Sequence, residues 1–219
     1  MALVPLATLL KHALKHQYAI PAFNISFQEQ AQAVLDAAVE TQSPVIIQFS
    51  KGGLKHASPW FLKGLLEQIK SSPLPICLHR DHCHTLEEVA EAISLGFSSI
   101  MMDGTLTADG KPNSLEQNIQ ITNKAMQMVK GKPISIEAEI GCRGSLETGL
   151  SGEEDGSGAS GKLTTSQMLT DPKEASEFVR ATGAHCLAIA IGTSHGAYKF
   201  QKPPTGAVLD INRVKDIQK

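Results

Sequence analysis

Two histidine-containing strings stand where apolar, strand-like segments of the chain end. The first is LHRDHCH, which contains Asp81 and His82, and the second is AIGTSHGAYK, which contains His195. A neutral imidazole can bind a metal ion such as Zn²⁺, and a carboxylate beside it can move a proton. Together the strings predict metal-assisted chemistry with proton transfer. Taken singly, each is also compatible with a surface Asp–His pair or a structural histidine.

Carboxylates at the ends of two further apolar segments add candidate ligands. Asp103 follows the string SIMM, and Glu137 and Glu139 share one face of segment 134–140, because side chains alternate along a strand. A buried carboxylate is costly unless it is paired, protonated or bound to a metal. These residues are therefore either metal ligands or members of buried salt bridges.

We do not expect the remaining histidines to coordinate the metal ion directly. His79 has the same strand parity as Asp81, so we expect it to orient a ligand from behind. His84 and His185 are not expected to bind metal.

Apolar, strand-like segments alternate with segments of helical periodicity along the chain. The expected strands are 18–25, 44–50, 75–82, 99–104, 134–140 and 185–192. Their near-continuous apolar character predicts a parallel sheet covered on both faces, so the first of them is expected to be buried. Ser26 and Glu29 predict a capping box at the start of one helix, and Thr85 and Glu88 predict another.

Six repeats of strand and helix predict an α/β fold of the (β/α)8 TIM-barrel type, with about six of the eight units present. The reactive residues gather at the carboxyl ends of the strands, which form the active-site face of such a barrel. A doubly wound sheet also fits the alternation, but no G-x-G-x-x-G follows the first strand. We therefore expect residues 1–219 to form a single, incomplete TIM-barrel domain.

Composition narrows the class of protein further. The chain has 219 residues, of which 42% are hydrophobic and 19% charged, and a net charge of −2. This charge argues against nucleic acid or an anionic membrane as the partner, and no segment has the roughly 18 apolar residues of a membrane span. The start of the chain predicts a helix rather than a signal peptide. The four cysteines form no C-x-x-C pair, so reduced thiols and a cytoplasmic location are expected.

Seven segments together resemble the class II, zinc-dependent fructose-bisphosphate aldolases, in the subtype with an extended loop. They are IPAFNI, SPVIIQFS, LHRDHC, SIMMDGT, EAEIGCRGSLETG, LTDPKEA and AIGTSHGAYKF. They follow the family order and extend across essentially the whole chain. The resemblance implies reversible cleavage of fructose 1,6-bisphosphate to dihydroxyacetone phosphate and glyceraldehyde 3-phosphate through an enediolate stabilised by zinc. Tagatose-bisphosphate aldolase is a sister interpretation.

The same resemblance implies a role for each matching residue of the metal site. His82 and His195 would be two of the three zinc ligands, and Asp103 and Glu139 would belong to an alternative metal position. Asp81 would transfer the proton of the C4 hydroxyl group. Zn²⁺ is the implied cofactor, with a second divalent or a monovalent cation as an addition.

The resemblance also implies contacts with a phosphorylated sugar substrate. These contacts would come from Asn24, Ser50, Gly196 and Lys199. The second acid–base residue would be a glutamate of the long loop, for which Glu154 is the choice and Glu147 the rival. A homo-oligomer is implied as well.

Parts of the family pattern have no match in this sequence. The third zinc histidine and an N-x-D-T phosphate motif belong to the seventh and eighth strands, and they would fall after Lys219. Arg80 replaces the apolar or amide residue that is usual in L-H-x-D-H. A truncated, non-catalytic remnant or an assembly partner is therefore an alternative to an active aldolase.

Overall fold

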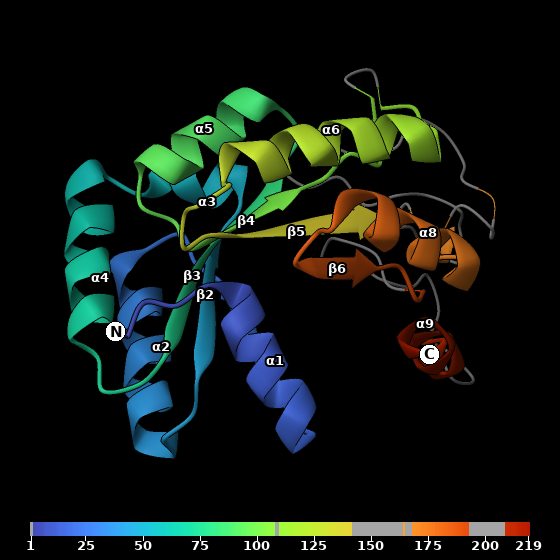
Figure 1. The fold of residues 1–219 in the computed structure, drawn as a ribbon. Helices are drawn as coiled ribbons and strands as arrows, with labels where there is room; N and C mark the ends of the chain where they lie inside the picture. The colour runs from blue at the N-terminus through green and yellow to red at the C-terminus, as the bar shows by residue number, and fades with distance from the viewer. Residues whose placement is uncertain (1, 108–109, 142–163, 165–167, 193–208) are drawn as a thin grey trace, which may run out of the picture. The chain divides into compact units, whose positions relative to one another are not determined.

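The strands of the protein form one sheet whose spatial order follows the chain. The computed structural model describes residues 2–107, 110–141, 164, 168–192 and 209–219. The order in the sheet is β1-β2-β3-β4-β5-β6 (Figure 1), and the first three pairs of neighbours are parallel. The strands are β1 (Ala22–Asn24), β2 (Val45–Phe49), β3 (Ile76–Cys83), β4 (Ser99–Met102), β5 (Ser135–Ile140) and β6 (Cys186–Ile189). All six predicted strands are confirmed, with shorter bounds at most ends.

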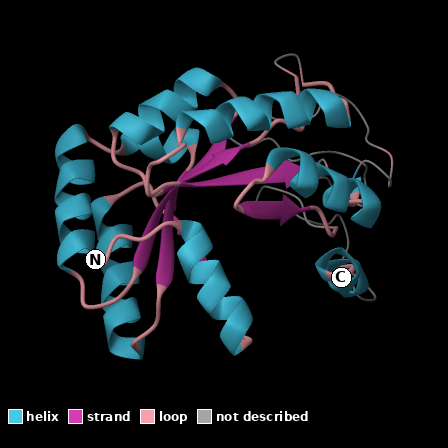
Figure 2. Cartoon of the chain, viewed as in Figure 1, coloured by secondary structure: helices cyan, strands magenta, loops and turns pink. Residues whose placement is uncertain are grey.

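Helices connect the strands, as the alternating pattern predicts (Figure 2). They are α1 (Leu6–His16), α2 (Gln28–Thr41), α3 (Lys51–His56), α4 (Pro59–Ser71), α5 (Leu86–Ser94), α6 (Leu115–Met128), α8 (Pro172–Thr182) and α9 (Ile211–Gln218). In the part of the chain that the structure describes, none of these helices has the length and apolar character that a membrane span requires.

The chain divides into two compact parts, and the first carries β1 to β4. It comprises residues 1–102 and 127–137. Its core consists of apolar side chains from β2, β3 and β4, among them Phe49, Leu78 and Ile100, all of which are buried. In Figure 1, α2 and α4 lie to one side of β2 and β3 and α1 lies to the other, so both faces of these strands are covered.

The second compact part comprises residues 103–126 and 138–219. Its core cluster joins β5 to α8. The buried members of the cluster are Ala138, Ile140, Ala175 and Phe178. Asp171 caps α8 by accepting the backbone N–H groups of Lys173 and Glu174, which agrees with the Asp-Pro helix start in the sequence.

The prediction that the first strand is buried is wrong. All three residues of β1 are exposed, and the Phe23 side chain is 45% exposed. The physical reason is position, because β1 lies at the end of the sheet order and pairs with β2 alone among the described strands. An apolar run in the sequence does not distinguish a central strand from one at a sheet end.

Of the two predicted capping boxes, one is confirmed and one is wrong. The Thr85 hydroxyl accepts the Glu88 N–H at 3.2 Å, and the Glu88 carboxylate accepts the Thr85 N–H at 3.3 Å. At α2 the helix begins at Gln28, and Gln30 rather than Glu29 reaches back to the N–H groups before the helix. The cap of α2 therefore lies one residue later than predicted.

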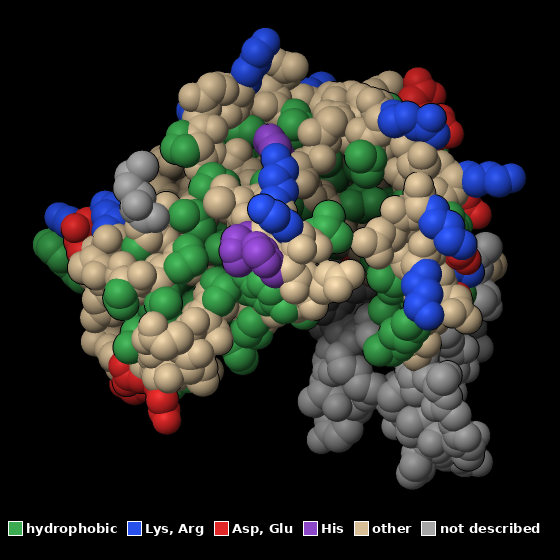
Figure 3. Space-filling model, turned by 60° about the horizontal axis from the view of Figure 1, so that its bottom comes forward, with side chains coloured by type: hydrophobic (Ala, Val, Ile, Leu, Met, Phe, Trp, Pro, Cys, Tyr) green, Lys and Arg blue, Asp and Glu red, His purple; other side chains and the backbone are tan. Residues whose placement is uncertain are grey.

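The described cysteines agree with the prediction of reduced thiols. Cys77, Cys83 and Cys186 are buried free thiols, whereas Cys142 lies outside the described residues. Burial raises the pKa of the Cys77 and Cys83 thiols to about 12, so both stay protonated at neutral pH. Side chains of both charges are scattered over the face drawn in Figure 3.

Candidate active site

The carboxyl end of β3 carries a bulge that turns two adjacent residues toward each other. Arg80 pairs with Ile100 of β4, and Cys83 pairs with Met102. Between these two pairs β3 therefore contains one residue more than β4. His82 takes a positive φ of 49°, which is uncommon for a residue with a side chain. As a result His82 Nε2 lies 3.7 Å from Asp81 Oδ1, although neighbours on a regular strand point to opposite faces.

Amide side chains from the two preceding strands hold the Asp81 carboxylate. Asn24 of β1 and Gln48 of β2 each donate a hydrogen bond to Asp81 Oδ2, and both bonds measure 2.9 Å. Gln48 also donates to Asn24 Oδ1 at 2.6 Å, so the three side chains form a closed network. Both donors are neutral amides that reach the same oxygen, so they fix the orientation of the Asp81 carboxyl group.

Gln48 is a site residue that the sequence analysis missed. A glutamine within an apolar strand gives little signal until the strand register is known. The register pairs Gln48 with Asn24 on one side and with His79 on the other. The feature that could have identified Gln48 is its place in VIIQF, where it is the one polar residue of an otherwise apolar strand.

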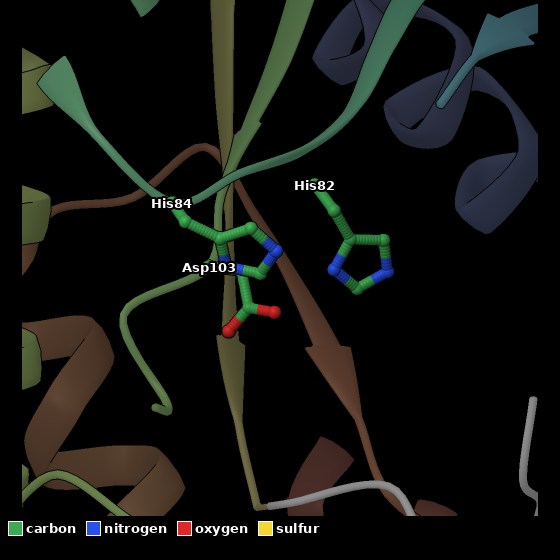
Figure 4. Close-up of side chains that lie close together, drawn as sticks. All are labelled: His82, His84 and Asp103. Atoms are coloured by element: carbon green, nitrogen blue, oxygen red, sulfur yellow. The ribbon is translucent and has the colours of Figure 1, made fainter. Parts of the chain in front are cut away.

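Three side chains at the ends of β3 and β4 form a group that could hold a metal ion. The nitrogen and oxygen atoms that His82, His84 and Asp103 offer lie within 4.8 Å of one another (Figure 4). The imidazole rings of the two histidines are stacked, with their centroids 6.1 Å apart. His84, which was not expected to be a ligand, therefore joins two of the predicted ligands.

The donor set of this group fits zinc. Two imidazole nitrogens and one carboxylate oxygen are ligands that Zn²⁺ accepts in proteins, and zinc sites with a catalytic role commonly use three protein ligands. Asp103 is buried, and its Oδ1 accepts hydrogen bonds from the backbone and the hydroxyl group of Thr105 at 3.0 and 2.6 Å. These bonds hold the carboxylate in one orientation, as the partners of metal ligands commonly do.

His79 occupies the buried position behind the site and is neutral. Its ring lies 3.0 Å from the Ser99 hydroxyl and 3.2 Å from the Glu137 carboxylate. Burial lowers the pKa of His79 to about 4 against a smaller opposing effect of Asp81. Glu137 is therefore the hydrogen-bond partner of a neutral histidine, whereas the expected alternative to a metal ligand was a buried salt bridge.

The other predicted residues divide into those that the structure describes and those that it does not. Ser50 follows β2 and caps α3, because its hydroxyl accepts the Gly53 N–H at 3.2 Å. Glu139 is buried in β5, and its backbone carbonyl accepts the side-chain amide of Asn118 at 2.8 Å. Four predicted residues lie outside the described part of the chain: Glu154, His195, Gly196 and Lys199.

A parallel strand-and-helix fold with a candidate metal group at its strand ends defines a class of metal-dependent barrel proteins. The family model for class-II fructose-bisphosphate aldolase matches residues 4–219 of this chain. The chain belongs to that family.

Curated relatives agree with the family match. The chain is 49% identical over 220 residues to a fructose-bisphosphate aldolase of Pseudomonas aeruginosa and 50% identical over 222 residues to one of Nostoc commune. These alignments cover 99% and 100% of this chain and 62% of each relative. The chain thus spans less than two thirds of the length of the relatives it matches.

Solved structures support the same fold. The YdjI aldolase of Escherichia coli K12 matches with a TM-score of 0.74 and 28% identity, covering 99% of this chain and 68% of that chain. The fructose-bisphosphate aldolase of Campylobacter jejuni matches with a TM-score of 0.70 and 25% identity, covering 97% of this chain and 62% of that chain. The predicted TIM-barrel type of fold is therefore confirmed.

Proposed function

We propose that this chain supplies the metal-binding and proton-transfer side of a class II fructose-bisphosphate aldolase site. The observation that carries the proposal is the bulged end of β3. There Asp81 lies beside His82, while Asn24 and Gln48 fix its carboxylate. A metal ligand and a separately held base, adjacent on one strand, suit a reaction in which a hydroxyl group loses a proton next to a polarised carbonyl.

Asp81 is the proposed acceptor of the C4 hydroxyl proton. The amides of Asn24 and Gln48 occupy Oδ2, so Oδ1 is the oxygen on the His82 side of the carboxylate. Two donors on one oxygen hold the Asp81 carboxyl group in one orientation. Proton transfer at Oδ1 then requires no rearrangement of the network, which lowers the cost of reaching the transition state.

His82, His84 and Asp103 are the described residues that would hold Zn²⁺, and His195 is a further proposed ligand. When bound, zinc supplies Lewis-acid stabilisation of the negative charge on oxygen atoms of the substrate. Glu139 is proposed as a ligand of the alternative metal position, because a buried carboxylate is stable when it is paired or metal-bound.

The family resemblance supports the remaining assignments. Asn24, Ser50, Gly196 and Lys199 are proposed to bind the phosphorylated sugar, and Glu154 is proposed as the second acid–base residue. We further propose that residues 1–219 belong to one barrel domain of a cytoplasmic homo-oligomer, with no nucleic acid or membrane as partner.

The direct test is cleavage of fructose 1,6-bisphosphate by the purified chain and by a chimera. In the chimera, the segment that follows Lys219 is taken from the Pseudomonas aeruginosa relative. The chimera is expected to bind zinc and to cleave the substrate, and chelation is expected to abolish cleavage. A folded chimera that binds zinc but leaves fructose 1,6-bisphosphate intact would contradict the proposed activity. Tagatose 1,6-bisphosphate, assayed beside it, decides the stereochemical preference.

A further inference from the structure

A buried arginine lies directly behind the bulged end of β3. Arg80 is 1% exposed and is the largest of the fully buried side chains. Its parity along β3 is opposite to that of His79 and Asp81, so it projects from the other face of the sheet. A buried guanidinium is costly, and such residues are retained where their hydrogen bonds are needed.

The guanidinium of Arg80 joins the ends of two neighbouring strands. Its Nη1 donates to the carbonyl oxygen of Phe49, the last residue of β2, at 3.3 Å. The same Nη1 donates to the carbonyl oxygen of Asp81, which lies within the bulge. Each of these carbonyls directly precedes a residue of the candidate site, because Ser50 follows Phe49 and His82 follows Asp81.

Arg80 bonds to the Asp81 carbonyl group at the point where the regular pairing of β3 with β4 is interrupted. The register shift lies between Arg80 and Cys83, and a bulge leaves backbone groups without their usual strand partner. A buried carbonyl must be paired with some donor. Arg80 supplies that donor at the peptide that leads into His82, whose positive φ of 49° needs support from its surroundings.

A carboxylate of α5 holds the backbone that follows the bulge. Glu88 accepts the His84 N–H at 2.8 Å and lies 3.0 Å from Lys51 Nζ. Glu88 therefore holds the backbone of His84, which directly follows the bulge.

The hydrogen bonding of Arg80 is incomplete, which argues against a purely stabilising role. Its Nε has no hydrogen-bond partner among the described residues. A buried charge with an unsatisfied donor is a poor way to stabilise a core, and an apolar side chain of similar size commonly serves as well or better. Local features that cost stability are expected at functional sites.

We propose that Arg80 is a positioning residue that fixes the bulge of β3 and thereby orients His82 beside Asp81. The guanidinium does not touch the substrate or the metal. It acts through the carbonyl groups of Phe49 and Asp81. The part of this inference that concerns metal affinity rests on the proposed function, whereas the part that concerns the backbone of β3 does not.

The test compares Arg80→Met, Arg80→Lys and a matched control in the full chain. Leu78→Met is the control, because Leu78 is buried on the same face of β3 two residues earlier. Arg80→Met is expected to weaken Zn²⁺ binding by about 10–100-fold, the range found when partners of metal ligands are removed. Its melting temperature is expected to change little, because two carbonyl groups lose their donor while the cost of burying the guanidinium is removed. Arg80→Lys keeps one donor and should give an intermediate affinity.

A second readout needs no metal. Hydrogen exchange of the backbone amides of residues 81–84 is expected to speed up roughly tenfold or more in Arg80→Met and to stay unchanged in Leu78→Met. Wild-type exchange and wild-type zinc affinity in Arg80→Met would overturn the proposal, and so would equal effects of the control. If the wild-type chain binds no zinc, the proposed function fails, and the exchange measurement alone decides the role of Arg80.

Discussion

At the scale of single residues, the candidate site separates the proposed base from the residues that could hold a metal ion. Asp81 is held by amides from β1 and β2, whereas His82, His84 and Asp103 form the group that could hold a metal ion. Substitutions should therefore affect proton transfer and metal binding independently.

Replacing Asp81 by Asn tests this separation. Asparagine keeps the size of the side chain but cannot take a proton, so cleavage of fructose 1,6-bisphosphate by the chimera should fall by about 10²–10⁴-fold. The zinc affinity should change by less than a few fold, because Asp81 is not among the proposed ligands. Steady-state cleavage rates and zinc titrations measure the two effects. A variant with unchanged cleavage rate would exclude Asp81 as the base.

His79 makes the stability of the metal-free chain depend on pH. Its pKa is lowered to about 4 by burial, from the ordinary value of 6.5. Between these values the unfolded chain binds more protons, so the free energy of unfolding rises with pH through this window. The contribution is complete above about pH 6.5 and is lost as the pH falls toward 4, on the order of 2–4 kcal/mol in total.

The measurement is denaturant unfolding of wild type and His79→Gln across pH 4 to 7. Because the two proteins share every other residue, the difference between the two slopes reports His79. Equal slopes would mean that His79 is not held neutral in the folded state.

Part of the site is predictable from the sequence and part requires the structure. Asp81 and His82 are predictable because an Asp–His pair at the end of an apolar strand indicates chemistry. His84 is not, because it follows the end of β3, where strand parity no longer indicates the direction of a side chain. Gln48 is not predictable either, because its partners come from two other strands.

At the scale of elements, the alternation of strands and helices is predictable, and their exact packing is not. All six strands occur where apolar runs predict them, because burial in a parallel sheet demands such runs. The exposure of β1 depends on its place in the sheet, which no local pattern records. Close contacts between helices and strands also depend on the tertiary structure, so a local sequence pattern does not predict them.

Two glycines in neighbouring helices test these contacts. A Cβ at Gly53 of α3 would lie 2.7 Å from the carbonyl oxygen of Ile25, whereas a Cβ at Gly64 of α4 would have no neighbour within 4 Å. Gly53→Ala should destabilise the chain by about 1–3 kcal/mol, because backbone must move. Gly64→Ala should stabilise it by up to about 1 kcal/mol, because alanine favours the helix. Thermal or denaturant unfolding of both variants gives the comparison, and effects of the same sign would contradict this packing.

At the scale of the whole molecule, the chain contains the β3 part of the candidate site and a limited share of the relatives' length. It matches the family model over residues 4–219 and spans 62% of the relatives' length. The candidate metal group of the described residues lies at the ends of β3 and β4. The account therefore predicts that this chain binds zinc without the segment that the chimera adds after Lys219. We expect the chimera to cleave fructose 1,6-bisphosphate.

The most direct measurement is the zinc affinity of the 219-residue chain, determined by competition with a chelator. His82→Gln is compared with wild type and with His12→Gln, whose substitution removes an exposed histidine of α1. The account predicts that wild type and His12→Gln bind one zinc ion with the same affinity and that His82→Gln binds it at least about 10-fold more weakly. Equal affinities of His82→Gln and wild type would contradict the claim that the end of β3 holds the metal.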